Sequence, residues 1–283
     1  MKLGVIGSGT MGYGIAQAAA QKGYEVLLYD IMQDQLDKAK NSIAASLKGR
    51  VAKGKISQEE MDSVIGNITT STDIQKLADR EIIIEAIIEK VELKQSVFSD
   101  IEKIVSKDTL LATNTSSLSI IEIAQGLKDP SRLIGIHFFN PAPVMKLVEI
   151  VRSLVVREDV VERAKQFAAS LDKEVILSKD TPGFVVNYLQ YPFRLNAIRM
   201  LEQGMATKED IDKAAKLGLG HPMGPFELQD LVGLDVTYNA VKAIYEETKD
   251  PAMAPPVLLK RMVEAGLLGR KTGKGFYEYP KDK

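Results

Sequence analysis

The stretch LGVIGSGTMG, residues 3–12, decides the fold class of this chain of 283 residues. A short apolar run ends in a turn with the pattern G-x-G-x-x-G, and a helical pattern follows over residues 10–22. In such a unit the first glycine permits a tight turn, the second lets the backbone approach a pyrophosphate, and the third lets helix and strand pack closely. Unpaired N–H groups at the start of the helix attract phosphate. We predict a dinucleotide-binding turn, rather than a glycine-rich turn without a ligand, with contacts from Gly7, Gly9, Thr10, Met11 and Gly12.

A carboxylate after the next apolar run indicates which dinucleotide binds. The run EVLLY, residues 25–29, reads as a second buried strand, and Asp30 closes it at close to the ~20-residue spacing expected from the glycines. A carboxylate at this position accepts hydrogen bonds from the adenine-ribose hydroxyls and repels a 2′-phosphate. Ile31 and Met32 supply no cation to hold such a phosphate. The sequence therefore predicts NAD rather than NADP as the cofactor.

Apolar runs and helical stretches continue to alternate as far as residue 180. Further strands are expected at residues 82–88, 109–113, 133–139, 146–151 and 174–177, and helices at residues 33–53, 91–105 and 158–171. This alternation is typical of a doubly wound, mostly parallel Rossmann-type α/β sheet. Beyond residue 180 only helical patterns remain, at residues 184–203, 208–217, 226–247 and 255–265. We predict an NAD-binding domain at residues 1–182 and a smaller all-helical domain at residues 183–283.

The composition excludes several kinds of chemistry. The chain has no cysteine, which excludes disulfides, zinc–cysteine sites and a cysteine nucleophile, and its two histidines are too few for a three-histidine metal site. A formal net charge of -1 argues against a nucleic-acid partner. No apolar run approaches the ~20 residues that a bilayer requires, and the first residues do not resemble a signal peptide. We expect a cytoplasmic protein that binds no metal, nucleic acid or membrane.

A histidine and a glutamate within neighbouring apolar runs are candidates for proton transfer. His137 ends one predicted strand, and Glu149 lies twelve residues later inside the run LVEIV. A carboxylate in such a run is costly unless it has a partner, and a histidine paired with it would be oriented as a general base. The alternative is a buried structural histidine with Glu149 facing solvent on an edge strand. The residues alone leave both interpretations open.

Two further polar groups each have a functional and a structural interpretation. Residues 114–117, NTSS, follow an apolar run, where they can contact a cofactor or substrate or can simply cap a helix beginning near residue 118. Asn187 falls in the first turn of the helix after the predicted domain junction, and clefts between domains often bind ligands. The alternative for Asn187 is a surface asparagine. His221 lies between Gly220 and Pro222, which favours a loop residue over a catalyst.

Seven segments of the chain, taken in order, resemble the 3-hydroxyacyl-CoA dehydrogenase family, and within it the short bacterial members that act on 3-hydroxybutyryl-CoA. The resemblance covers essentially the whole chain and favours the His–Glu pair over its alternative. The segments are VIGSGTMGYGIAQ, EAIIEK, NTSSLSI, HFFNPAPVMKLVE, DTPGFVVN, GHPMGPFELQDLVGLD and TGKGFYEY.

This resemblance implies roles for individual residues. His137 corresponds to the catalytic base of the family and Glu149 to the carboxylate that pairs with it. Ser116 and Asn187 correspond to the serine and asparagine that contact the substrate. Asn114 corresponds to a residue near the nicotinamide, and the implied contacts on the cofactor side are Glu89 and Lys94.

The resemblance also implies where the CoA phosphates bind. A basic cluster, Arg50, Lys53 and Lys55, ends the helix expected at residues 33–53 and matches the region that holds these phosphates in the family. Lys53 is our choice within this cluster. One position departs from the family pattern, because Tyr188 follows Asn187 where the family usually has arginine, which puts in doubt any salt bridge at that point.

The implied reaction is the reversible NAD-dependent oxidation of a (3S)-3-hydroxyacyl-CoA, such as 3-hydroxybutyryl-CoA, to the 3-ketoacyl-CoA, here acetoacetyl-CoA. It belongs to fatty-acid or butyrate metabolism and needs no metal. The family also suggests a homodimer formed through the helical half, and closure of that half over the substrate. Two alternatives are a dehydrogenase of a hydroxy acid without CoA and a non-catalytic NAD-binding protein on the same fold.

Overall fold

The structure is a computed structural model that describes residues 1–280. The chain divides into two compact units, one of residues 1–181 and one that begins at Pro182. Among the described residues, no helix combines the length and the apolar character needed to cross a bilayer.

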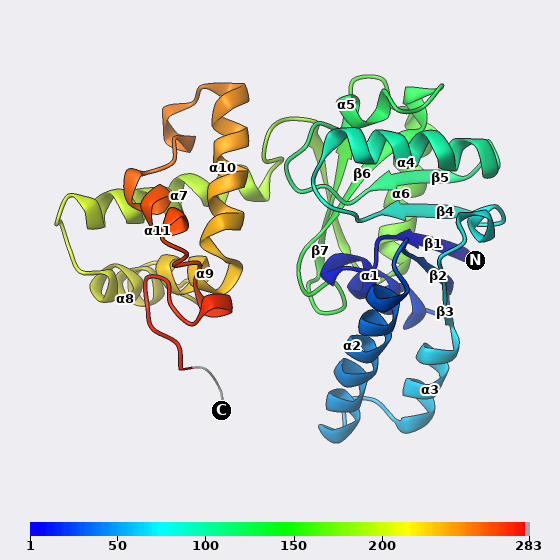
Figure 1. Ribbon diagram of the computed structural model, residues 1–283, viewed down its shortest axis with the longest axis horizontal. Helices are drawn as coiled ribbons and strands as arrows, with labels where there is room; N and C mark the ends of the chain where they lie inside the picture. The colour runs from blue at the N-terminus through cyan, green and yellow to red at the C-terminus, as the bar shows by residue number, and fades with distance from the viewer. Residues whose placement is uncertain (281–283) are drawn as a thin grey trace. The chain divides into compact units, whose positions relative to one another are not determined.

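The first unit is built around a sheet that has eight strands within residues 1–280 (Figure 1). In chain order the strands are β1 (Lys2–Ile6), β2 (Glu25–Tyr29), β3 (Ile68–Ser71), β4 (Ile82–Glu85), β5 (Leu110–Thr113), β6 (Leu133–Phe138), β7 (Leu147–Arg152) and β8 (Glu174–Lys179). Their order across the sheet is β3-β2-β1-β4-β5-β6-β7-β8. Every neighbouring pair is parallel except β6 and β7, which are antiparallel. The predicted doubly wound, mostly parallel sheet is confirmed.

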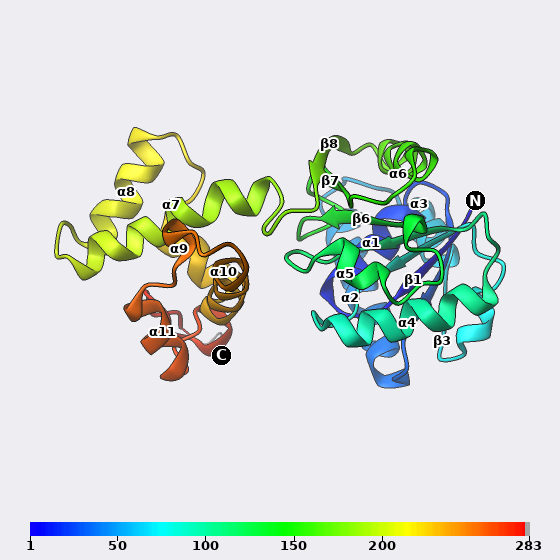
Figure 2. The ribbon, with the colours of Figure 1, turned by 90° about the horizontal axis from the view of Figure 1, so that it is seen from above.

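Helices cover both faces of this sheet. They are α1 (Thr10–Ala20), α2 (Gln33–Ala52), α3 (Gln58–Gly66), α4 (Val91–Ile104), α5 (Ile120–Ala124) and α6 (Glu158–Ser170), with 3₁₀ turns at Ile74–Leu77 and Pro130–Arg132. Helices α1 and α6 share one apolar core with the strands, and Figure 2 shows α4 and α5 on the face opposite α6. Because helices cover both faces, strands such as β4 are apolar at nearly every position.

Two details of the sheet differ from the predictions. Strand β4 ends at Glu85, although an apolar run extends to residue 88, because the Glu85 carboxylate accepts a hydrogen bond from the Ile87 N–H at 2.7 Å and turns the chain there. Strand β3 was not predicted. Its four residues, ITTS, lie at the edge of the sheet and include an exposed position, so they lack the apolar run of a buried strand.

The second unit is helical over its described residues, apart from isolated β-bridges near its end, which confirms the predicted all-helical half. Its helices are α7 (Val186–Glu202), α8 (Lys208–Gly218), α9 (Pro225–Val232), α10 (Leu234–Thr248) and α11 (Val257–Glu264), with 3₁₀ turns at Pro251–Met253 and Arg270–Thr272. The single helix predicted at residues 226–247 was wrong. Gly233, with φ of +106°, separates α9 from α10, because an α-helix cannot continue through that conformation.

Candidate functional site

Polar residues gather where the parallel strands of the first unit end. The residues that follow or close these strands at their carboxyl ends are Gly7 after β1, Asp30 after β2, Glu85 in β4, Asn114 after β5 and His137 in β6. The carboxyl ends of parallel strands meet at one edge of a sheet, which is where open α/β sheets bind their ligands. This edge is therefore the candidate functional site of the first unit.

The glycine-rich turn between β1 and α1 requires two of its glycines for steric reasons. Gly7 has φ of +95°, and a Cβ atom there would lie 2.7 Å from the Ala86 carbonyl oxygen. A Cβ atom on Gly12 would lie 1.8 Å from the carbonyl oxygen of Gly7. At Gly9, by contrast, a Cβ atom would meet nothing within 4 Å. Gly7 and Gly12 therefore shape the turn, while Gly9 leaves the backbone open to an approaching group.

Asp30 lies directly beside this turn. One carboxylate oxygen, Oδ2, accepts hydrogen bonds from the backbone N–H of Ser8 at 2.8 Å and from its hydroxyl at 2.7 Å. The other oxygen, Oδ1, accepts from the N–H of Met32 at 3.1 Å. These contacts fix a half-buried carboxylate next to the start of α1.

His137 and Glu149 face each other across the antiparallel pair β6 and β7. They are direct partners in the strand register, and His137 Nδ1 lies 2.6 Å from Glu149 Oε2. Glu149 is fully buried and His137 is 6% exposed, so the interpretation with Glu149 on a solvent-facing edge strand does not apply. With Nδ1 donating to the carboxylate, the neutral imidazole carries its acceptor lone pair on Nε2.

The NTSS segment does not cap the following helix. The N-cap of α5 is Ser119, whose side chain accepts from the N–H of Glu122. Asn114 Oδ1 instead accepts from the Phe138 N–H at 2.9 Å, which connects the end of β5 to the residue after His137. Ser116 donates its N–H and its hydroxyl to Glu89 Oε1, at 2.7 Å and 3.1 Å. The segment is therefore held by contacts at the strand ends.

A network of charged side chains connects Glu85, through Lys94, to Glu89, which accepts the hydrogen bonds of Ser116. Glu85 is fully buried and accepts hydrogen bonds from Lys94 Nζ at 2.6 Å and from the Thr113 hydroxyl at 2.6 Å. Lys94, 1% exposed, also pairs with Glu89 Oε2 at 3.3 Å. The family resemblance singled out Lys94 and Glu89 but not Glu85, which lies inside the apolar run that extends to residue 88. A carboxylate inside an apolar run was the signal that singled out Glu149, and it applies equally to Glu85.

Asn187 belongs to the second unit, in the first turn of α7, and is 6% exposed rather than a surface residue. Its side-chain oxygen accepts a hydrogen bond from Gln190 Nε2 at 2.9 Å. Tyr188, at the position where the family usually has arginine, is half exposed and donates its hydroxyl to Asp250 Oδ2 at 3.2 Å. His221 is exposed, and its ring centroid lies 4.9 Å from that of Phe193.

A cavity of about 400 Å³ lies between α1, the end of α2 and the loop of residues 140–144. Its wall contains the cations Arg50 and Lys55 and the hydroxyls Ser42 and Ser46, and no carboxylate from the described part of the chain. This charge balance suits an anion. Lys53, the residue chosen from the sequence, ends α2 as its exposed C-cap and is not part of this wall.

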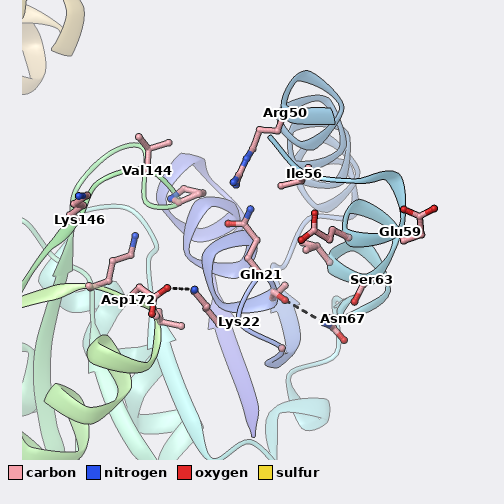
Figure 3. Close-up of a pocket in the computed structure, with 17 residues that line it drawn as sticks. Gln21, Lys22, Arg50, Ile56, Glu59, Ser63, Asn67, Val144, Lys146 and Asp172 are labelled. Carbon is pink, nitrogen blue, oxygen red and sulfur yellow. Dashed lines mark hydrogen bonds and ion pairs between the residues drawn. The ribbon is translucent and has the colours of Figure 1, made fainter. Parts of the chain in front are cut away.

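A larger cavity of about 760 Å³ lies at the other end of α1 (Figure 3). Arg50 lines both cavities, and in Figure 3 its side chain extends from α2 toward Gln21. The larger cavity also contains the carboxylates Glu59, Glu60 and Asp172, and Asp172 forms an ion pair with Lys22. Four cations of the described chain also line it, Lys22, Arg50, Lys146 and Lys173, so positive and negative charges nearly balance. The smaller cavity, whose charged lining residues within residues 1–280 are cations alone, is therefore the better site for an anion.

Comparison with known proteins places both units in one family. The family model described as 3-hydroxyacyl-CoA dehydrogenase, NAD binding domain, matches residues 2–181. The model described as 3-hydroxyacyl-CoA dehydrogenase, C-terminal domain, matches residues 183–279.

Individual relatives align over nearly the whole chain. A 3-hydroxybutyryl-CoA dehydrogenase of Mycobacterium tuberculosis is 46% identical over 98% of both chains. A 3-hydroxyadipyl-CoA dehydrogenase of Escherichia coli is 42% identical over 97% of this chain, which spans 58% of that longer protein. The crystal structure of (S)-3-hydroxybutyryl-CoA dehydrogenase from Ralstonia eutropha superposes with a TM-score of 0.95 at 40% identity, covering 99% of each chain.

Proposed function

This chain belongs to the 3-hydroxyacyl-CoA dehydrogenase family and has its NAD-binding domain, and on that premise we propose that it interconverts a (3S)-3-hydroxyacyl-CoA and the corresponding 3-ketoacyl-CoA. The observation that carries this proposal is the buried pair of His137 and Glu149 at the edge of the sheet. The relatives are named for acyl-CoA substrates that carry a hydroxyl group on C3 and differ in the acyl group. 3-Hydroxybutyryl-CoA is the first substrate to test.

The geometry of the glycine-rich turn fits the cofactor. Gly9 leaves room for a pyrophosphate against the backbone, and the start of α1 offers N–H groups to the pyrophosphate oxygens. The Asp30 carboxylate would accept hydrogen bonds from the adenine-ribose hydroxyls. When bound, NAD⁺ would accept the hydride that leaves C3 of the substrate. Glu89, Lys94 and Asn114 are proposed to line the cofactor side of the site.

His137 is proposed as the general base. Its Nε2 would take the proton of the C3 hydroxyl, and Glu149, at 2.6 Å from Nδ1, would stabilise the imidazolium that forms. In the reverse direction His137 returns this proton to the keto oxygen. The Ser116 hydroxyl, positioned by Glu89, would hold the oxygen on C3. The role of Asn187 as a substrate contact stays a prediction from the family resemblance.

The decisive experiment is an assay of NADH absorbance with acetoacetyl-CoA, repeated with free acetoacetate, with longer 3-ketoacyl-CoA esters and with NADPH. We expect turnover with CoA esters and NADH and at most weak turnover with free acetoacetate or NADPH. Preference for free acetoacetate would indicate a dehydrogenase of unesterified acids. No turnover with any chain length would favour a non-catalytic NAD-binding protein.

Gly12 and Gly9 of the turn provide a matched pair of variants. Gly12→Ala should lower the free energy of unfolding by about 1–3 kcal/mol, because its Cβ atom would collide with the Gly7 carbonyl. Gly9→Ala should leave stability within about 0.5 kcal/mol of the parent, yet raise the Kd for NADH by about tenfold, which corresponds to ~1.4 kcal/mol. Urea unfolding and fluorescence titration measure the two effects. Equal NADH affinity in Gly9→Ala and the parent would contradict a pyrophosphate at this turn.

The cavity with Arg50 and Lys55 is proposed to hold the phosphates of CoA. Arg50→Ala should raise KM for acetoacetyl-CoA about tenfold with little change in kcat, because the phosphates are remote from C3, and the effect should shrink as salt screens the charges. Lys53→Ala is the matched control, since Lys53 lies outside the cavity wall. A larger KM effect at Lys53 would instead favour the choice made from the sequence.

Two further expectations from the sequence stay predictions. These are a cytoplasmic location and a homodimer formed through the helical half.

A further inference from the structure

Arg194, on α7 of the second unit, is a buried cation without an acidic partner. It is 2% exposed. Its Nη2 donates to the Thr237 hydroxyl at 2.6 Å and its Nη1 lies 3.4 Å from Gln190 Oε1, while its Nε has no hydrogen-bond partner. No carboxylate among residues 1–280 forms an ion pair with it. Burial lowers the pKa of this guanidinium to about 10.

Such an environment is unfavourable for a guanidinium. Arginine presents five N–H donors in a planar fork that suits a carboxylate, and a charge removed from water normally has such a partner. Here only a hydroxyl, an amide oxygen and the ring of Tyr191, whose centroid lies 5.5 Å away, offset the charge. The donors that these groups leave unused make Arg194 a binding group for an anion.

Arg194 lines a cavity of about 310 Å³ that is otherwise mainly apolar. Gln190 and His221 are the other polar residues of its wall, to which residues 1–280 contribute no carboxylate. The apolar side chains of the wall are Val186, Leu189, Phe193, Met223, Pro225 and Leu228. A wall of this kind suits a short hydrocarbon chain that ends in a negative charge, since the chain contacts apolar groups and the charge reaches the guanidinium.

The cavity is connected to the predicted substrate contact on the same helix. Gln190 donates to Asn187 and lies within hydrogen-bond distance of Arg194, at 2.9 Å and 3.4 Å. The spacings of three and four residues place the three side chains on one face of α7. Seven residues of helix correspond to a rise of about 10 Å. Because the single amide of Gln190 connects both side chains, the polar ends of Asn187 and Arg194 lie closer together than this rise. A substrate held by Asn187 can therefore bring a carboxylate a few carbons further along its chain to Arg194.

We propose that this protein prefers 3-hydroxyacyl-CoA substrates whose acyl chain ends in a carboxylate, and that Arg194 binds this carboxylate. The proposal rests on the proposed function, because it takes Asn187 as a substrate contact. Arg194 would act on specificity and not on the chemistry at C3. Gln190 would hold both Asn187 and Arg194 in position.

The test compares two substrates of equal length, 3-ketoadipyl-CoA and the uncharged 3-ketohexanoyl-CoA, by NADH absorbance. The parent protein should have a kcat/KM about 30-fold or more higher for the charged substrate, the lower end of what a desolvated charge pair contributes. Arg194→Met, which keeps an unbranched apolar side chain, should abolish this preference. Arg261→Met, at an arginine that is 69% exposed on α11, should retain it.

Each outcome decides between the proposals. Equal or lower kcat/KM for the charged substrate in the parent protein overturns the role of Arg194, even if Arg194→Met fails to fold. Turnover of acetoacetyl-CoA without such a preference leaves the proposed function intact, whereas no turnover of any ester overturns the proposed function itself. An unchanged preference in Arg194→Met, together with a fall in molar mass by light scattering, would assign the partner anion to a second copy of this chain and overturn the proposal.

Discussion

Replacing His137 with glutamine should lower kcat for acetoacetyl-CoA reduction by about 10²–10⁴-fold, the usual contribution of a positioned general acid or base. Glutamine fills a similar volume and keeps a polar side chain opposite Glu149, but it cannot exchange a proton near neutral pH. NADH affinity should be retained, because the glycine-rich turn and Asp30 follow other strands, β1 and β2. Steady-state kinetics and fluorescence titration of NADH measure the two quantities on the same preparation.

Two comparison variants make this result specific. Glu149→Gln should reduce kcat less than His137→Gln does, since it removes the charge that stabilises the imidazolium and leaves the imidazole in place. Glu158→Gln, at a glutamate 64% exposed on α6, should leave kcat unchanged. Turnover near that of the parent protein in His137→Gln would eliminate His137 as the base, and loss of NADH binding in that variant would show that the substitution disturbs the fold.

The pairing of His137 with Glu149 was predictable because its cause is local. Both residues lie in apolar runs separated by a short connection, residues 139–146. A parallel crossover needs a dozen or more residues, so this connection permits only an antiparallel pair. The register of β6 and β7 then places the two side chains opposite each other. The same reasoning, applied to connection length, would have predicted the antiparallel orientation itself.

Arg194 could not be predicted in this way. It lies in a helix with other charged residues, and nothing in the neighbouring sequence distinguishes it from the exposed arginines. Its burial depends on Thr237, 43 residues further along the chain on α10. Such positions are determined by tertiary packing of distant helices, and a pattern within one helix does not contain that information.

Glu85 is an intermediate case. Its place within an apolar run is visible in the sequence, but its partners come from α4 and from β5, and Thr113 lies 28 residues away. The neighbouring Glu89, four residues later, was assigned from the family resemblance alone. The structure adds that Lys94 connects the two carboxylates, at 2.6 Å and 3.3 Å. Glu89 in turn accepts both hydrogen bonds from Ser116.

Replacing Glu85 with glutamine should therefore lower the free energy of unfolding by about 3–5 kcal/mol, the cost of removing one partner of a buried ion pair. The substitution leaves the ammonium of Lys94, 1% exposed, with the longer contact to Glu89 as its ion pair and a 3.4 Å contact to the Ile87 carbonyl. Urea unfolding measures this loss. Asp100→Asn, which breaks the exposed pair with Lys103 on the same helix, should cost less than about 1 kcal/mol.

The double variant Glu85→Gln with Lys94→Met separates the cost of an unpaired buried charge from the value of the pair itself. Removing both charges should recover most of the stability that Glu85→Gln loses, because buried pairs often contribute little relative to apolar replacements. Activity should not recover with it, since Glu89 then lacks the cation that holds it toward Ser116. A double variant as unstable as Glu85→Gln would show that the buried charge of Lys94 is not the cause. Full recovery of kcat/KM would show that the network serves the fold alone.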